Sequence, residues 1–306
     1  MNDDRLAWLR EAMSPPRRSI VELIGGGVLD AELAALAWIL VETRLPLIVG
    51  GMTRGAGKTT LLEALLDFLP TSVQRVELRG VDEDFGWLPE AGSLGWSGVG
   101  GIIAGGAAAD APAGGPVSPE TAYLVAPELS SHLPLYTDGV AARTLIRAAS
   151  IGYGIAATIH ADRLEDVHSE LRRQEIGLTE DELSYLGLVL IIRPERGSDG
   201  HIRRRVVAAH YARPLGRDEH GHTQRLPPAV LAVRDEEADR LDHFAWGVMP
   251  EIAVRLGRKA GDLEQDQADR AAFLASLVAG GVVDVESVRT AIEGWRRSSS
   301  VRPGIH

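Results

Sequence analysis

The fold class is decided by the stretch Gly55-Ala56-Gly57-Lys58-Thr59-Thr60. The apolar run Leu47-Ile48-Val49 comes before it, and leucines at helical spacing follow from Thr59 to Phe68, where Pro70 ends the pattern. The sequence therefore predicts a buried strand, a glycine-rich turn over residues 50–57 and a helix, in that order. This succession is typical of a phosphate-binding P-loop.

Each residue type in this stretch suits the binding of phosphate. Glycines let consecutive backbone N–H groups curl around phosphate oxygens, and the start of the following helix adds partial positive charge. The Lys58 ammonium can reach the β- and γ-phosphates, and the Thr59 hydroxyl can ligate Mg²⁺. We therefore expect ATP and Mg²⁺ as cofactors. The predicted nucleotide-binding residues are Thr53, Arg54, Gly55, Ala56, Gly57, Lys58, Thr59 and Thr60.

The rarity of lysine singles out Lys58. Of the 32 basic residues, only Lys58 and Lys259 are lysines, and a planar guanidinium is a poor substitute for an ammonium at this position. The strict P-loop pattern asks for glycine where Met52 stands, with Gly50 and Gly51 just before it, so the loop is imperfect or slightly expanded. A chance glycine-rich turn is the alternative, and the agreement of strand, loop and helix argues against it.

Composition excludes several classes of protein. The 306 residues include 43 acidic residues, 32 basic residues and no cysteine, which excludes a disulfide scaffold, a cysteine-ligated zinc site and a cysteine nucleophile. The net charge of −11 argues against a protein that coats nucleic acid. No signal-peptide pattern begins the chain, and no apolar run approaches the roughly 20 residues of a membrane-spanning helix. We expect a cytoplasmic protein with no transmembrane segment.

Strands and helices alternate along the chain up to about residue 212, which predicts an α/β domain with a mostly parallel sheet. The predicted helices are 31–41, 59–68, 140–150 and 164–173, and the predicted strands are 47–49, 75–78, 123–126, 155–159, 188–192 and 204–208. We divide the chain into a helical stub at 1–25, a core at 26–212 and a mainly helical extension at 213–306. The Gly/Ala/Pro-rich segment 91–116 is a loop, a lid or an interface.

The motifs and their order resemble the type II/type IV secretion ATPase superfamily, which includes the motors of type IV pili, archaella and tight-adherence pili. The resemblance runs from about Arg18 to Trp295. The lead-in Ser19-Ile20-Val21-Glu22-Leu23-Ile24 and the tail from Ala271 to Ile292 are similar to the archaeal and tight-adherence branches. The resemblance implies a RecA-like P-loop core that hydrolyses Mg-ATP to power filament assembly or protein secretion. It also implies a homohexameric ring that contacts an inner-membrane platform protein from the cytoplasmic face.

Two further motifs of the superfamily have counterparts here. The Walker B strand corresponds to Tyr123-Leu124-Val125-Ala126-Pro127-Glu128, with Pro127 in place of glycine, and Glu128 would orient or deprotonate the attacking water. The histidine box corresponds to residues 151–162, where Tyr153 takes the first histidine position and His160 keeps the second. The resemblance therefore implies Lys58, Glu128 and His160 as catalytic residues. It implies Thr59 and Glu128 as the metal-binding residues.

Other candidate residues keep a structural alternative. The acidic segment of the superfamily has its nearest counterpart in 82–84, although Arg79-Gly80 occupy the usual acidic positions, and an exposed acidic loop explains 82–84 equally well. Arg143 and Arg147 are candidates for an arginine that completes a neighbouring site, with structural ion pairing as the alternative. The run 203–205 contacts a partner subunit or an anionic surface, or is a solvated edge strand. A metal site at His210, His220 and His222 is less plausible than a polar loop.

Two alternative functions remain open. Met52, Arg79, Pro127 and Tyr153 favour a non-hydrolysing or slow nucleotide-binding paralogue that acts as a regulator or scaffold. A DNA-handling RecA-like ATPase is the second alternative, and the acidic net charge argues against it.

Overall fold

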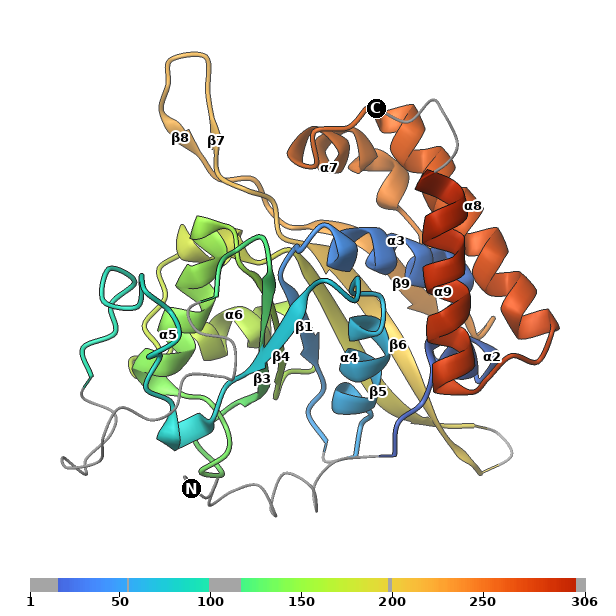
Figure 1. The fold of residues 1–306 in the computed structure, drawn as a ribbon, viewed down its shortest axis with the longest axis horizontal. Helices are drawn as coiled ribbons and strands as arrows, with labels where there is room; N and C mark the ends of the chain where they lie inside the picture. Colours follow the sequence, from blue (N-terminus) through green and yellow to red (C-terminus); the bar gives the residue numbers. More distant parts are fainter. Residues whose placement is uncertain (1–15, 54, 99–116, 198–199, 301–306) are drawn as a thin grey trace.

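One eight-stranded sheet forms the centre of the molecule in the computed structural model, which describes residues 16–53, 55–98, 117–197 and 200–300 (Figure 1). The strand order is β10-β9-β6-β5-β1-β4-β3-β2, and β7 and β8 form a separate hairpin. The strands are β1 (Leu47–Gly50), β2 (Gln74–Glu77), β3 (Ala122–Leu129), β4 (Gly154–Ile159), β5 (Leu188–Arg196), β6 (Ile202–Tyr211), β7 (Gly216–Arg217), β8 (Thr223–Gln224), β9 (Ala229–Asp235) and β10 (Arg240–His243).

Five neighbouring strands of this sheet, β5-β1-β4-β3-β2, are parallel, and β6, β9 and β10 continue it in antiparallel fashion. Strand β4 lies between the P-loop strand β1 and the strand β3 that ends near Glu128. This order confirms the predicted RecA-like α/β fold with a mostly parallel sheet. Because the carboxyl ends of parallel strands meet at one edge, the segments that follow β1, β3 and β4 are brought together there.

Helices cover both faces of the sheet (Figure 1). Leu47 and Val49 of β1 pack in the hydrophobic cluster that contains α2, α3, α4 and the C-terminal helices, whereas Ile48 packs in the cluster that contains α5 and α6. The helices are α2 (Ile20–Gly25), α3 (Ala31–Glu42), α4 (Lys58–Leu66), α5 (Gly139–Ala148), α6 (Leu164–Arg172), α7 (Met249–Arg255), α8 (Ala260–Ala279) and α9 (Val285–Ser300). None of the helices in the described ranges is both long and apolar enough to cross a membrane.

The predicted helices and strands between residues 31 and 212 are present, with ends shifted by a few residues. Strands β9 and β10 were not predicted. Strand β10 is only four residues long and reads Arg-Leu-Asp-His, without a run of apolar or β-branched residues. Strand β9 begins with the apolar run Ala-Val-Leu-Ala-Val, and this signal was missed. The polar loop expected at 213–225 contains the short β7–β8 hairpin, which projects from the body of the molecule (Figure 1). Residues 1–15 and 99–116, about which the sequence also made predictions, lie outside the described residues. The division at residues 25 and 212 stays a prediction.

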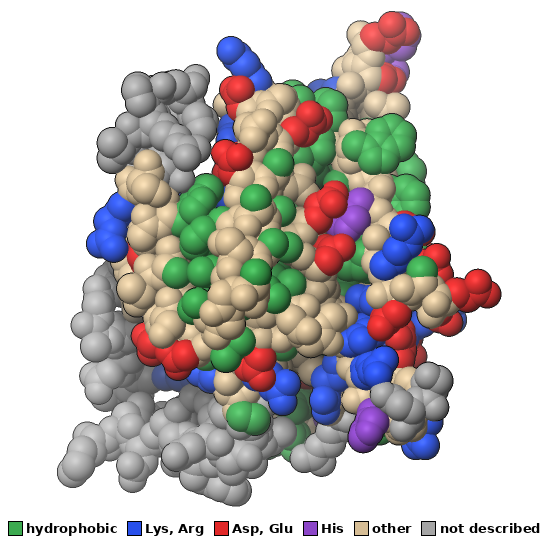
Figure 2. Space-filling view, turned by 90° about the vertical axis from the view of Figure 1, so that its right-hand side faces the viewer, with side chains coloured by type: hydrophobic (Ala, Val, Ile, Leu, Met, Phe, Trp, Pro, Cys, Tyr) green, Lys and Arg blue, Asp and Glu red, His purple; other side chains and the backbone are tan. Residues whose placement is uncertain are grey.

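The C-terminal helices are held to the core by a cluster of aromatic rings and one arginine. Trp38 of α3 stacks on Phe68 and contacts Trp295 of α9, each with ring centroids 5.0 Å apart. The guanidinium carbon of Arg270 lies 4.5 Å from the Trp38 ring centroid and 4.8 Å from that of Trp295. Arg270 also pairs with Glu42 and Asp266. The outer surface of this region carries charges of both signs with hydrophobic side chains between them (Figure 2).

We expect Arg270→Met to lower the free energy of unfolding by about 2 kcal/mol, because the change removes a partly buried cation that pairs with Glu42 and Asp266 and lies over two indole rings. Arg296 and Arg258 would still pair with these two carboxylates. Urea denaturation followed by circular dichroism measures this. The matched control is Arg240→Met, which removes an exposed ion pair with Asp242 and should cost less than about 1 kcal/mol. Equal losses in the two variants would contradict the assigned role of Arg270.

An ion pair between β10 and α3 makes part of the stability depend on pH. His243 Nε2 lies 2.7 Å from Asp30 Oδ2, and the other Asp30 oxygen accepts the backbone N–H of Leu33 at the start of α3. Burial alone would lower the pKa of His243, but the hydrogen bond and charge of Asp30 outweigh it and raise that pKa. Burial alone would raise the pKa of Asp30. The hydrogen bonds from His243 and from the Leu33 N–H outweigh burial, so the pKa of Asp30 is lowered.

The pair therefore stabilises the fold fully above the usual aspartate pKa of 3.8 and below the usual histidine pKa of 6.5. Its contribution is lost as the pH rises through the raised pKa of His243. We expect the wild type to lose more stability between about pH 6 and about pH 9 than His243→Gln does. Urea denaturation across this range tests it, and parallel pH profiles would refute the assignment.

Candidate functional site

The turn after β1 has the backbone of a phosphate-binding loop. Helix α4 begins at Lys58, and Gly57 caps it with a φ of +100°, while Gly55 has a φ of +79°. Residues with a Cβ rarely adopt these angles, so glycine is required at both positions. The first backbone N–H groups of α4 have no partner within the helix and point toward the turn, which makes this end suited to an anion.

Gly51 lets the turn approach its neighbours closely. A Cβ at this position would lie 2.9 Å from the carbonyl oxygen of Ile192 on β5 and 3.0 Å from Cγ of Lys58. The missing side chain therefore leaves room for the stem of Lys58 against the carboxyl end of β5.

Lys58 is a buried cation with defined partners. Only 7% of its surface is exposed, and its Nζ donates a hydrogen bond to the Gly51 carbonyl oxygen at 2.9 Å. The same Nζ lies 3.0 Å from Glu128 Oε1. A buried ammonium is costly unless it is paired, so this contact fixes the position of both side chains.

Glu128 lies at the end of β3, beside an irregularity in the pairing with β4 between Ala126 and Leu129. Its Oε2 accepts a hydrogen bond from the Thr158 hydroxyl on β4 at 2.8 Å. Its Oε1 faces Lys58 and also lies 3.3 Å from His160 Nε2. One carboxylate oxygen is therefore held by the neighbouring strand, and the other faces the P-loop.

His160 connects the turn to Glu128. It follows β4, and its Nδ1 lies 3.1 Å from the carbonyl oxygen of Met52. The same Nδ1 lies 3.4 Å from Lys58 Nζ. A carbonyl oxygen can only accept and an ammonium can only donate, so Nδ1 can bond to only one of these two partners at a time. The ring thus contacts the P-loop backbone on one side and the carboxylate of Glu128 on the other.

His132 belongs to the same site and was not predicted. Its ring meets that of His160 edge to face, with centroids 5.6 Å apart, and its Nδ1 bonds to the Ser130 hydroxyl. It follows Glu128 by four residues in a loop without periodicity. Only its closeness in sequence to Glu128 could have pointed to it.

All described residues among the predicted nucleotide-binding and catalytic set line one cleft of about 1050 Å³. Arg54 lies outside the described residues. The second wall of the cleft is formed by the start of α2 and by residues 202–205 of β6. The Arg204 Nε donates a hydrogen bond to the Gly55 carbonyl oxygen at 2.8 Å.

Several other candidates serve structural contacts instead. The buried Glu83 carboxylate accepts the backbone N–H groups of Arg79 and Phe85 and the indole N–H of Trp87. The Tyr153 hydroxyl donates to a backbone carbonyl, and burial, followed by the charge of a nearby glutamate, raises its pKa to about 12.

The two arginines proposed as completing residues also have local partners, because Arg143 bonds to the Ile176 carbonyl and Arg147 pairs with Glu182. His220 and His222 lie on the exposed hairpin, where Asp218 bonds to both backbones. Within the described parts of the chain, no three histidine and acidic residues are grouped as a metal site.

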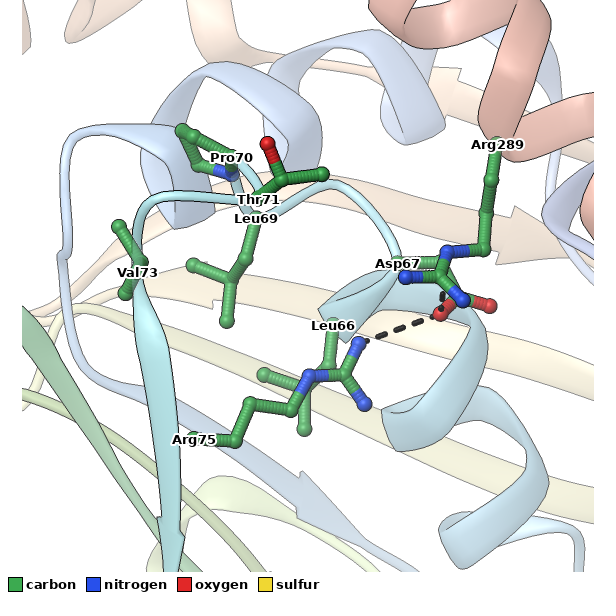
Figure 3. Close-up of a pocket in the computed structure, with 8 residues that line it drawn as sticks. All are labelled: Leu66, Asp67, Leu69, Pro70, Thr71, Val73, Arg75 and Arg289. Atoms are coloured by element: carbon green, nitrogen blue, oxygen red, sulfur yellow. Dashed lines mark hydrogen bonds and ion pairs between the residues drawn. The ribbon is translucent and has the colours of Figure 1, made fainter. Parts of the chain in front are cut away.

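A smaller pocket of about 240 Å³ lies near the other end of α4 (Figure 3). Arg75 and Arg289 both point toward Asp67 in this view. Asp67 Oδ1 lies 3.2 Å from Arg75 and 2.6 Å from Arg17, and its side chain is buried. This cluster ties the end of α4 to β2 and α9 and shares no residue with the cleft.

No protein-family model matches this chain, and no curated protein sequence matches it. Among solved structures it is similar to the VirB11 ATPase from the Brucella suis type IV secretion system in complex with sulphate, with 18% identity, a TM-score of 0.39 and coverage of 69% of this chain and 57% of that chain. It is also similar to the Legionella pneumophila ATPase DotB, with 13% identity, a TM-score of 0.33 and coverage of 76% and 55%. The chain spans less than two thirds of either protein, and their names describe those two proteins alone.

We expect Gly51→Ala to weaken the binding of a fluorescent ATP analogue about tenfold, because the added methyl group would displace the stem of Lys58 or the end of β5. Fluorescence titration measures the affinity. Gly92→Ala is the matched control, since a Cβ there meets nothing within 4 Å. Equal affinities in the two variants, with unchanged circular dichroism, would contradict the close packing of this loop.

Proposed function

We propose that this chain is an ATPase of the type II/type IV secretion superfamily that binds and hydrolyses Mg-ATP in the cleft at the carboxyl edge of the sheet. The observation that carries the proposal is the contact of 3.0 Å between Lys58 Nζ and Glu128 Oε1. It joins the P-loop lysine to the Walker B glutamate across β4, although 70 positions separate them in the sequence.

The turn fits a nucleotide triphosphate and Mg²⁺. The left-handed glycines, the free N–H groups at the start of α4 and the Lys58 ammonium suit the phosphates. Thr59 and Glu128 would hold Mg²⁺ together with the phosphates, because hydroxyl and carboxylate oxygens are the ligands it prefers. The bound ion would neutralise charge that develops on the transferred phosphoryl group.

Glu128 acts on the attacking water in this proposal. Thr158 fixes one carboxylate oxygen, and Lys58 and His160 compete for the other. Phosphate groups offer Lys58 a stronger partner, so binding of the nucleotide would release Oε1 to accept a proton from water. His160 links this oxygen to the P-loop backbone at Met52, which suits a residue that responds to the γ-phosphate.

The wider role in this proposal is to power filament assembly or protein secretion as a homohexamer on the cytoplasmic face of an inner membrane, in contact with a platform protein. The support for this part is the resemblance of the motifs and of the flanking segments 19–24 and 271–292. No nucleic-acid partner is proposed.

A second candidate is a regulator that binds nucleotide and hydrolyses it slowly or not at all. One observation favours it: Glu83, the central residue of the candidate acidic segment, uses its carboxylate to hold residues 79–87. Within the described residues, Glu128 is then the only carboxylate in contact with Lys58.

Steady-state turnover of Mg-ATP over a range of protein concentrations separates these functions. We expect turnover per subunit to rise with concentration, as a shared site in a ring requires. Lys58→Ala and Glu128→Gln should each lower it by at least about 100-fold, because they remove the phosphate partner and the water-activating group.

Lys259→Ala, which changes the other, exposed lysine at the start of α8, is the control and should keep wild-type turnover. Binding of ATP that is lost in Lys58→Ala, with no hydrolysis at any concentration, would reject the motor and favour the regulator. Stimulation by DNA would instead favour a DNA-handling ATPase.

A further inference from the structure

The lining of the cleft is basic although the chain as a whole is acidic. Among the described residues, five cationic side chains and two carboxylates line the cleft, a formal charge of +3 with histidines neutral, in a chain whose net charge is −11. Four of the five cations, Arg18, Arg203, Arg204 and Arg205, come from the second wall and not from the P-loop. A concentration of one sign in a cleft favours an anionic ligand.

The sheet topology places Arg204 over the P-loop. Strand β5 runs parallel to β1, so its carboxyl end lies at the P-loop edge, and β6 starts from this end in antiparallel direction. Arg204 pairs with Pro194, beyond the register shift between Ile191 and Ile192. Its stem lies against the turn, because its Cδ would be 2.8 Å from a Cβ placed on Gly57.

Arg204 differs from Arg205 and Arg18 in having no carboxylate partner among the described residues. Arg205 pairs with Asp239 at 2.9 Å, and Arg18 lies 3.5 Å from Glu22. In the described ranges of the chain, no acidic side chain pairs with Arg204, and its one hydrogen bond is from Nε to Gly55 O. The two terminal guanidinium nitrogens are thus available in the cleft, in the planar arrangement that binds phosphate.

We infer that Arg204 is a second cationic binding residue for the phosphate chain of the nucleotide, supplied within the same chain by β6. The inference rests on the proposed nucleotide site and adds a residue to it. Arg204 touches the loop at Gly55 and Gly57, whereas Glu128 and His160 touch Lys58 and Met52. The inference places Arg204 on the phosphates that ADP and ATP share, so Arg204 would contribute to the binding of both and would not act on the attacking water.

The test compares Arg204→Gln with Arg204→Lys in the full-length chain, with fluorescent ADP and ATP analogues as probes. Gln keeps an N–H donor for the Gly55 carbonyl but removes the charge, whereas Lys keeps the charge. We expect Gln to weaken both nucleotides about tenfold and Lys to weaken them less. The logarithm of affinity should depend less steeply on the logarithm of salt concentration in Arg204→Gln, because this variant loses one ionic contact, and the steepness should be unchanged in Arg204→Lys.

The controls are the wild type, Arg240→Met and Lys58→Ala. Arg240→Met, an exposed arginine outside the lining of the cleft, should bind like the wild type. Two outcomes would overturn the inference and assign Arg204 to loop packing. In the first, Arg204→Gln binds nucleotide as tightly as the wild type. In the second, Arg204→Gln and Arg204→Lys bind equally weakly and the salt slope of Arg204→Gln is unchanged. If the wild type binds nucleotide and Lys58→Ala does not, such a result leaves the proposed function standing. If the wild type binds no nucleotide, both the proposed function and this inference fail.

Discussion

A buried ammonium group at the start of α4 sets the conditions that the rest of the site has to meet. A cation with 7% of its surface exposed needs a partner, and Lys58 donates a hydrogen bond to the Gly51 carbonyl and forms an ion pair with the Glu128 carboxylate. The carboxylate of Glu128 is itself buried and depends on Thr158 and His160. These residues follow or belong to three different strands, so the pair requires β4 to lie between β1 and β3.

The second wall of the cleft is held by a comparable network at the antiparallel end of the sheet. Arg205 of β6 and Arg234 of β9 both pair with Asp239, which has a left-handed φ of +47°. The same arginines donate to the carbonyl oxygens of Gly26 and Gly27 after α2. The segment after α2 and strand β6 are therefore tied to each other, and Arg204 projects from a fixed support onto the P-loop.

The sequence was most informative where local order and chemistry coincide. The strand, the glycine turn and Lys58 could be located because each has its own signal in the sequence. Glu128 and His160 were named from the resemblance of their motifs to those of the secretion ATPases. The glycine turn, Lys58, Glu128 and His160 line one cleft. His132 could not be predicted, since it lies in an irregular loop and meets His160 only through the fold.

The same limit explains why strand β10 and the contact of Arg204 with the P-loop were missed. Strand β10 has four residues and an almost wholly polar sequence, and the spacing of polar and apolar residues carries little information at this length. The contact between Arg204 and Gly55 depends on the register of β6 against β5 and on a shift in that register, neither of which is set by a local motif. The sequence could indicate a basic run on a strand, but only the paired register shows which of its arginines reaches the P-loop.

The arrangement of charge also explains why the site needs more than one cation if it binds a triphosphate. Lys58 alone would have to serve both Glu128 and the phosphates, and a carboxylate left close to several phosphate charges would repel them. Mg²⁺ at Thr59 and the guanidinium of Arg204 would each reduce this repulsion. The concentration of arginine along the cleft would thus offset phosphate charge that the single P-loop lysine cannot offset alone.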